Sequence, residues 1–209
     1  MSTTWPAFRD NIVRVLISDV AKKKVTDDNL LAFANIALNT LTRDAPRRAY
    51  FDLTGNGSSF AFTMPSATYK LLLVEDTQER EYLSEVKVQP GTKSPDATRS
   101  TTSRPRGYMP NFPQEGTLSF AHIPSDGSVI RVHYNAYYTA MYATGSLPFE
   151  SGWKEEALAA YTSYLAFSAM ASARAQNEQW DQRSALPVDN PLEQQARFFL
   201  EQYRRVVTA

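Results

Sequence analysis

The stretch LPFESGWKEEALAAYTSYLAFSAMASARAQ, residues 147–176, decides how this chain is organised. Its pattern predicts the longest helix of the protein, with apolar or small side chains almost all the way round. A helix on the surface of a self-contained domain shows one apolar stripe and one polar face. We therefore expect this helix to be buried on more than one side, either at the centre of its own bundle or between that bundle and a neighbouring subunit.

Three further helices are predicted from apolar side chains at three- and four-residue spacing. The segment VTDDNLLAFANIALNTL has Thr26 or Asp27 as its N-cap and ends before Pro46, because the residue before proline disfavours the α region. One helix precedes it, and the last begins near Pro191. The expected stripes are Trp5, Phe8, Ile12, Val15, Leu16 and Asp19; then Leu30, Phe33, Ala34, Ala37, Leu38 and Leu41; and finally Leu192, Ala196, Phe199, Tyr203 and Val206.

These three helices are too few, on this reasoning, to cover the long helix completely. We therefore expect a second copy of the chain to complete its burial. The candidate subunit-interface residues on the long helix are Trp153, Ala157, Ala160, Tyr164, Phe167 and Ala171.

The middle of the chain changes to a period of two, which predicts strands. AYFDLT and SFAFTM flank Gly55-Asn56-Gly57, and GTLSFAHI and SVIRVHYNAYY flank residues 124–127, so two hairpins are expected. In the last of these strands Ile130, Val132 and Tyr134 alternate with Arg131 and His133. The segment therefore predicts an antiparallel sheet, folded as a small sandwich or open barrel.

The order of these elements predicts an α+β fold, in which a helical bundle of two N-terminal and two C-terminal helices carries an inserted antiparallel β-sandwich or barrel-like domain. We expect an N-terminal helical part at 1–46, the β domain at 47–146 and a C-terminal helical part at 147–209. Residues 90–107 form a long polar loop, and loops of that length are often functional. The basic residues of that loop, which are candidates to face a partner or DNA, are Lys93, Arg99, Arg104 and Arg106.

Composition narrows the function classes. The 209 residues include 22 basic and 22 acidic side chains, and this neutrality argues against a dedicated nucleic-acid-binding domain. The absence of cysteine excludes disulfides, thiolate metal sites and cysteine nucleophiles. The N-terminus lacks a secretory pattern, and no run approaches the ~20 apolar residues that span a bilayer. We expect a soluble protein that does not contact membranes.

Candidate catalytic and metal-binding groups are few. His122 and His133 are expected on neighbouring strands, but no carboxylate on those strands completes a ligand set. The GNGSS segment lacks the spacing of a phosphate loop and leads into a strand. The acidic cluster around Glu75 is best explained as a solvated turn. We therefore expect neither an enzyme nor a cofactor or metal site.

A tyrosine-rich segment leaves a ligand-binding alternative open. Its members are Tyr108, Tyr134, Tyr137, Tyr138 and Tyr142. Such a set suggests a platform for stacking sugars, and a β-sandwich protein that binds carbohydrate or another ligand remains the alternative from another class. Core packing accounts equally well for Tyr134 and Tyr138, which share the apolar face of their strand.

The layout as a whole resembles the head–tail connector (adaptor) proteins in the neck of tailed double-stranded DNA bacteriophages. The resemblance rests on VTDDNLLAFANIALNTLTRDAP, on a β insertion entered near FTMPSATYKLLLVED, on RPRGYMP before a strand, on GTLSFAHIPSDGSVIRVHYNAYYTAM, and on LPFESGWKEEALAAYTSYLAF. Together these segments cover nearly the whole chain.

The resemblance implies a structural virion protein with no catalysed reaction. Copies of the chain would form a homo-oligomeric ring, typically a dodecamer, between the capsid portal and a stopper or tail protein. The ring would extend the DNA channel and make only transient, non-specific contact with the duplex. A stopper or tail-terminator ring of the same neck is the related alternative. The protein would be made in the host cytoplasm and reside at the head–tail interface of the virion. In this family the C-terminal segment commonly docks onto the portal, which here would involve Phe198, Phe199, Tyr203, Arg204 and Arg205.

Overall fold

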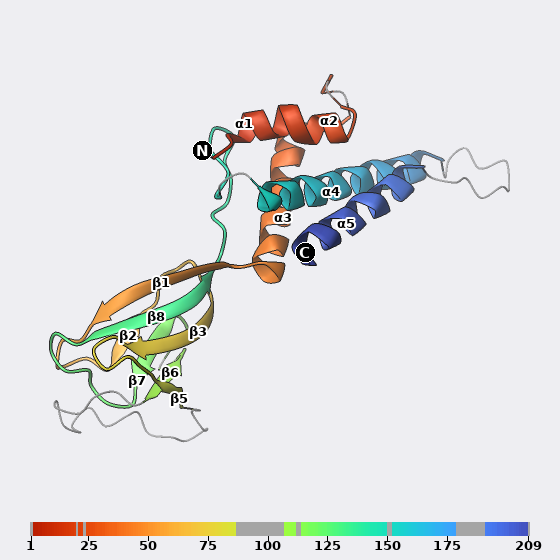
Figure 1. Cartoon of the computed structure of the whole chain (residues 1–209). Coiled ribbons are helices and arrows are strands. Elements are labelled where there is room, and N and C mark those ends of the chain that lie inside the picture. Colours follow the sequence, from red (N-terminus) through yellow and green to blue (C-terminus); the bar gives the residue numbers. More distant parts are fainter. Residues whose placement is uncertain are drawn as a thin grey trace. The chain divides into compact units, whose positions relative to one another are not determined.

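Figure 1 shows the computed structural model of the chain, which describes residues 2–19, 21–22, 24–86, 107–111, 114–149, 152–178 and 191–208. The fold is mixed α+β, with four continuous helical stretches and two four-stranded sheets in the described residues, neither of them closed into a barrel. Two compact units emerge. The helical unit comprises the described residues of Met1–Ala45 and Tyr138–Ala209, and the β unit those of Pro46–Tyr137.

The first helical stretch of the helical unit changes its winding partway along. It runs through α1 (Trp5–Phe8), the π-helical turn η1 (Arg9–Val13) and α2 (Arg14–Leu16). A π turn holds one more residue than an α turn, so every later side chain is rotated by about 100°. Val13, Arg14 and Ile17 consequently point into the core.

The expected stripe of this first helix is therefore wrong at Val15 and Leu16, whereas its last member, Asp19, is buried. Val15 is 55% exposed and Leu16 is also exposed, because the π turn rotates both out of the core. Trp5 and Phe8, which precede the turn, are buried as the spacing predicts.

The second helix, α3 (Asp27–Asp44), agrees with its sequence pattern. The Thr26 hydroxyl caps it by accepting a hydrogen bond from the Asn29 N–H at 3.2 Å, which satisfies a donor that the first turn leaves unpaired. The buried side chains of α3 that belong to the expected stripe are Leu30, Ala34, Ala37, Leu38 and Leu41. This helix also ends before Pro46, as predicted.

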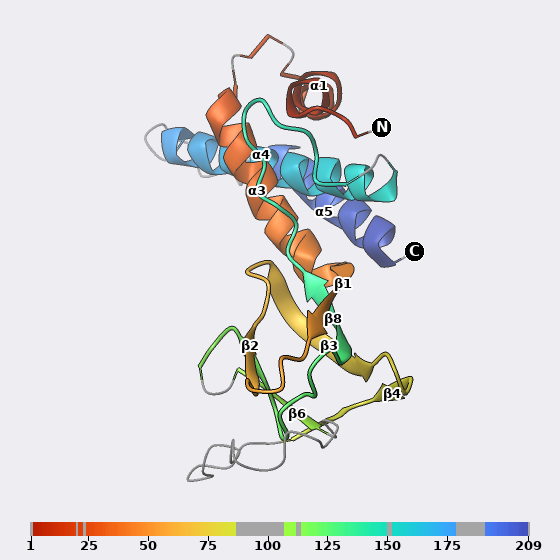
Figure 2. The same ribbon diagram turned by 90° about the vertical axis from the view of Figure 1, so that its left-hand side faces the viewer.

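The long helix α4 (Trp153–Glu178) runs beside the last helix, α5 (Pro191–Thr208), and α3 crosses α4, as Figures 1 and 2 show. Aromatic side chains join α4 to α5: the rings of Phe167 and Phe199 stack at 5.6 Å, and those of Tyr161 and Tyr203 meet edge-on at 4.8 Å. The buried residues of α5 are Ala196, Phe199 and Tyr203, which confirms its predicted stripe.

The β unit contains two sheets that share one apolar core. The first has the order β1 (Arg47–Thr54), β8 (Val129–Ala136), β3 (Thr68–Asp76) and β4 (Glu81–Tyr82). The second has the order β2 (Ala61–Thr63), β7 (Thr117–Phe120), β6 (Gly107–Pro110) and β5 (Ser84–Glu85). All pairings are antiparallel except that of β5 with β6. The buried core side chains are Leu53, Val74, Tyr108, Leu118, Phe120, Ile130 and Val132.

Both expected hairpins are wrong, although their strands exist. β1 pairs with β8 and β2 pairs with β7, so each expected turn connects strands that lie in different sheets. The two turns bond to one another instead: the Gly55 N–H donates to the Ser128 carbonyl at 2.8 Å, and the Gly127 N–H donates to the Gly55 carbonyl at 3.0 Å. Turn residues predict where a chain reverses, but partner choice depends on packing far along the sequence.

Candidate functional site

The predicted subunit-interface helix is largely covered by its own chain. Ala157, Ala160, Phe167 and Ala171 are buried within the helical unit, whereas Tyr164 is partly buried and Trp153 is 46% exposed. Four of these six residues are therefore already buried by the subunit itself, although Ala160 also lines a shallow groove. The expectation that three helices cannot cover α4 is wrong along residues 157–167, because short side chains, including the fully buried Thr162 and Ser163, let the neighbouring helices approach closely.

The helical unit nevertheless exposes large apolar side chains elsewhere. Trp153 begins α4, Phe198 on α5 is 62% exposed, and Val15 and Leu16 stand outward after the π turn. Single exposed apolar residues are ordinary, but a group of them beside a groove is typical of an interaction surface.

Such a groove lies between the first helix and α4. It has a volume of about 350 Å³. Its lining residues are Ile12, Leu16, Gly152, Glu155, Glu156, Ala159, Ala160 and Gln202. The alanines and Leu16 make an apolar floor, while the two carboxylates stand in the first turn of α4, where the helix dipole favours negative charge. The groove suits an apolar side chain flanked by basic groups.

The predicted portal-docking segment divides in two. Phe199 and Tyr203 are buried in the helical unit, and the Tyr203 hydroxyl donates to the Asp44 Oδ2 at 2.6 Å. These two residues hold α5 in place and cannot dock a partner. Phe198, Arg204 and Arg205 are exposed and remain candidates. The basic-loop candidates Lys93, Arg99, Arg104 and Arg106 lie outside the described residues.

A buried ionic cluster fixes the end of the first helix, and the sequence patterns missed it. Arg14 is 1% exposed and Asp19 is 2% exposed, and the Arg14 Nη1 lies 2.9 Å from the Asp19 Oδ2. Arg14 also donates to the Val25 carbonyl at 3.2 Å and pairs with Asp27. Asp19 accepts further hydrogen bonds from the N–H groups of Lys24 and Val25, at 2.9 Å each. The cluster joins the first helix to the connector and to the start of α3.

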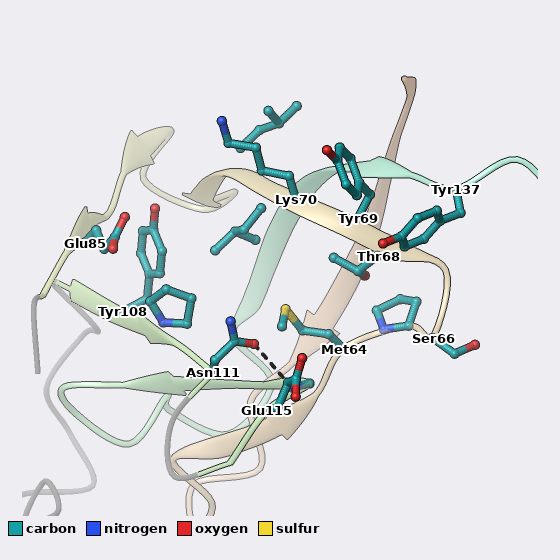
Figure 3. Close-up of a pocket in the computed structure, with 15 residues that line it drawn as sticks. Met64, Ser66, Thr68, Tyr69, Lys70, Glu85, Tyr108, Asn111, Glu115 and Tyr137 are labelled. Atoms are coloured by element: carbon teal, nitrogen blue, oxygen red, sulfur yellow. Dashed lines mark hydrogen bonds between the residues drawn. The ribbon is translucent and has the colours of Figure 1, made fainter. Parts of the chain in front are cut away.

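The β unit contains a second hollow, which is amphipathic (Figure 3). Its volume is about 490 Å³. Tyr69 and Tyr137 lie at one end, with ring centroids 5.1 Å apart, and Glu85 and Tyr108 lie at the other. The remaining lining residues are Met64, Pro65, Ser66, Thr68, Lys70, Leu71, Leu72, Pro110, Asn111, Glu115 and Gly116. Two of the five tyrosines of the expected sugar platform, Tyr108 and Tyr137, thus line one pocket.

The other three tyrosines of that platform lie elsewhere. Tyr134 is buried on β8, and Tyr138 and Tyr142 belong to the helical unit. Burial raises the pKa of the Tyr108 phenol, and the negative charge of Glu85 raises it further. Tyr108 therefore stays protonated at neutral pH and can donate a hydrogen bond.

The two histidines do not form a pair. His133 lies on β8 of the first sheet, whereas His122 follows β7 of the second sheet, so the expected neighbouring-strand arrangement is wrong. His133 faces Glu75, with 3.4 Å between the Nε2 and a carboxylate oxygen. Among the residues that the structure describes, no group of three or more His, Asp or Glu side chains could hold a metal ion.

The same sheet face carries an exposed ion pair between Arg131 and Asp52. The guanidinium donates two hydrogen bonds to the carboxylate, at 2.8 and 2.9 Å, and it also lies over the Tyr50 ring at 4.5 Å. These hydrogen bonds lower the pKa of the Asp52 carboxyl. The arrangement is a cross-strand contact on a solvated sheet face, and it offers no acid, base or nucleophile set for catalysis.

Comparisons with known proteins give no assignment: no protein-family model matches the chain, and no curated protein matches it significantly. Within the described part of the chain, no helix is long and apolar enough to span a bilayer.

Proposed function

We propose that this chain is a structural protein of the neck of a tailed bacteriophage virion, in which copies form a head-to-tail adaptor ring between the portal and the tail. In this arrangement the helical unit builds the ring, and the β unit, folded as a sandwich inserted into the bundle, faces outward or toward the tail. The ring extends the DNA channel and contacts the duplex only transiently. It catalyses no reaction.

The observation that carries the proposal is the apolar groove of the helical unit beside the exposed Leu16 and Val15. The π turn buries Val13 and Ile17 but turns Val15 and Leu16 into water, and a subunit that contacts other subunits can use such an exposed apolar surface. The long helix does not supply such a surface, because its candidate residues are mostly buried in the subunit itself.

A ring requires a heterologous contact, in which one surface of a subunit meets a different surface of the next. The groove supplies an apolar concave surface with Glu155 and Glu156 on it. Among the exposed residues of α5 are the apolar Phe198 and the basic Arg204 and Arg205, with the acidic Glu201 between them. The apolar side chain and the two arginines support a head-to-tail contact between copies, with the portal as the competing partner for α5.

Negative-stain electron microscopy and native mass spectrometry of the purified full chain test the proposal. Rings with a central hole wide enough for duplex DNA are expected, either for the protein alone or after mixing with its portal. A protein that stays monomeric alone, with the portal and with the adjacent tail protein would refute it. A ring that binds the tail but not the portal would favour the stopper or tail-terminator alternative.

A further inference from the structure

The pocket of the β unit is built by two irregularities of strand β3. The pairing of β3 with β8 skips Tyr69 and Leu72, because the register shifts between Thr68 and Lys70 and again between Leu71 and Leu73. Each shift is a β-bulge, which leaves one extra residue unpaired and re-aims its side chain. Both extra residues line the pocket and are exposed. Bulges of this kind are over-represented next to functional sites.

The aromatic end of the pocket is held by the backbone. The N–H of Tyr137 donates to the Ala67 carbonyl at 2.8 Å, which fixes Tyr137 beside the turn that enters β3. The Tyr69 and Tyr137 rings then meet at an interplanar angle of 66°, and the two side chains are 39% and 43% exposed. An apolar rim formed by these two rings and Leu72 therefore faces solvent in a fixed geometry, ready to pack against a flat apolar surface.

The interior of the pocket carries both donors and acceptors. The Oδ1 of Asn111 accepts a hydrogen bond from the Gly116 N–H at 3.2 Å, which leaves the amide NH₂ group to donate elsewhere (Figure 3). Tyr108 offers a protonated hydroxyl, and Glu85 and Glu115 offer carboxylate oxygens.

The lining carries charges of both signs and so gives no strong preference for an ionic ligand of either sign. Lys70 repels a cation that Glu85 and Glu115 attract, and the two carboxylates repel an anion that Lys70 attracts. A ligand that suits the pocket is therefore uncharged, has many hydroxyl groups, and presents one apolar face to the tyrosines. Its size is limited by a volume of about 490 Å³, within the range of about 300–1,000 Å³ that is usual for small-molecule sites.

We propose that this pocket binds a neutral carbohydrate of one or two sugar rings, with one ring face against Tyr69 or Tyr137 and the hydroxyls hydrogen-bonded to Asn111, Tyr108 and the two glutamates. The inference is independent of the neck assignment, because it uses only residues of the β unit. It gives the β unit a recognition role in addition to any structural one.

The test uses the full chain and saturation-transfer NMR. The probes are maltose, cellobiose, lactose and N,N′-diacetylchitobiose as neutral disaccharides, with glucuronic acid and N-acetylarginine amide as charged comparators; an array of neutral glycans extends the search. At least one neutral glycan should show a saturation-transfer signal, which indicates that it binds to the protein. Tyr69→Ala or Tyr137→Ala should weaken its binding about tenfold, the equivalent of one lost stacking contact. The matched control is Tyr82→Ala, which removes an exposed tyrosine of the same unit that does not line the pocket.

Three outcomes would overturn the inference: no neutral glycan binds; a charged probe binds more tightly than every neutral one; or both pocket variants bind as well as the wild type. None of these bears on ring assembly, which should be intact in Tyr137→Ala. Failure of the sugar site and failure of the neck proposal are thus distinguished by the same preparations.

Discussion

Replacing Arg14 with methionine should destabilise the helical unit strongly. Methionine keeps an apolar stem that fills most of the same space, so the change removes charge and hydrogen bonds rather than volume. Arg14 contributes two hydrogen bonds to the Val25 carbonyl and one close contact to each of Asp19 and Asp27. The substitution removes the ion pair between Arg14 and the buried Asp19 carboxylate.

The magnitude follows from the burial of both groups. Removing one member of a buried ion pair typically costs about 3–5 kcal/mol. Asp19 keeps the two N–H donors of Lys24 and Val25, so the lower end, about 3 kcal/mol, is expected. For a chain of this size that loss lowers Tm by about 6–12 °C. Asp19→Asn should also destabilise the unit, and Arg14→Met with Asp19→Asn should cost less than the sum of the two single changes by about 1 kcal/mol or more.

Thermal and chemical unfolding followed by far-UV circular dichroism measures these differences. The matched control is Arg197→Met, because Arg197 pairs with Glu193 at 2.7 Å on the exposed surface of α5. Its loss should change the unfolding free energy by about 0.5 kcal/mol or less. If Arg14→Met costs no more than Arg197→Met, the buried cluster does not stabilise the fold and the reasoning is wrong.

Three further changes test other parts of the structure. Burial and the hydrogen bond to Asp44 raise the pKa of Tyr203, so only the unfolded chain loses this proton near its ordinary pKa of about 10. Stability should therefore fall as the pH rises above about 10, and fall less in Tyr203→Phe, as Tm measured between about pH 8 and about pH 11 will show. Equal slopes in the two proteins would contradict this. Leu16→Glu should abolish ring assembly, while Tm should change by no more than about 2 °C because the side chain is exposed. Intact rings in electron micrographs of this variant would show that the groove is not part of the contact between subunits. Gly55→Ala should destabilise the β unit by about 2–3 kcal/mol, because the added Cβ would lie 2.3 Å from a backbone carbonyl oxygen. Gly127→Ala should cost about 1–2 kcal/mol, because its Cβ would meet no atom within 4 Å but the residue has a φ of +75°. Denaturant unfolding that ranks the two variants in the reverse order would refute the steric argument.

The elements that sequence periodicity predicted well are those whose burial is set by regular local geometry. Strand β8 alternates as expected, with Ile130, Val132 and Tyr134 buried and Arg131 and His133 on the other face. Helices α3 and α5 bury the predicted stripes for the same reason. In each case the side-chain spacing of an undistorted helix or strand determines which residues meet the core.

Features that depend on a distortion or on distant partners were not predictable in this way. The bulges that expose Tyr69 and Leu72 are shifts in the pairing of β3 with β8, a strand that lies more than fifty residues away in the chain. The sugar-platform hypothesis therefore included Tyr137 but not Tyr69. Similarly, the burial of α4 depends on how closely α3 and α5 approach its small side chains, and a helical wheel cannot show that distance.

The Arg14 cluster and the proposed ring surface depend on each other, which gives a final prediction. An unbroken α-helix from Trp5 would place Leu16 in the core and Arg14 toward solvent; the π turn reverses this, and the buried carboxylate of Asp19 stabilises Arg14 in its inward position. The ionic cluster therefore keeps Leu16 on the groove. Arg14→Met removes the ionic contribution to the π turn and leaves only the burial of Val13 and Ile17 to favour it, so we expect the helix to regain in part an α-helical register that withdraws Leu16. Ring assembly should then be weakened even well below the Tm of the variant, where circular dichroism shows the unit folded. Normal rings formed by folded Arg14→Met would show that the position of Leu16 does not depend on this cluster.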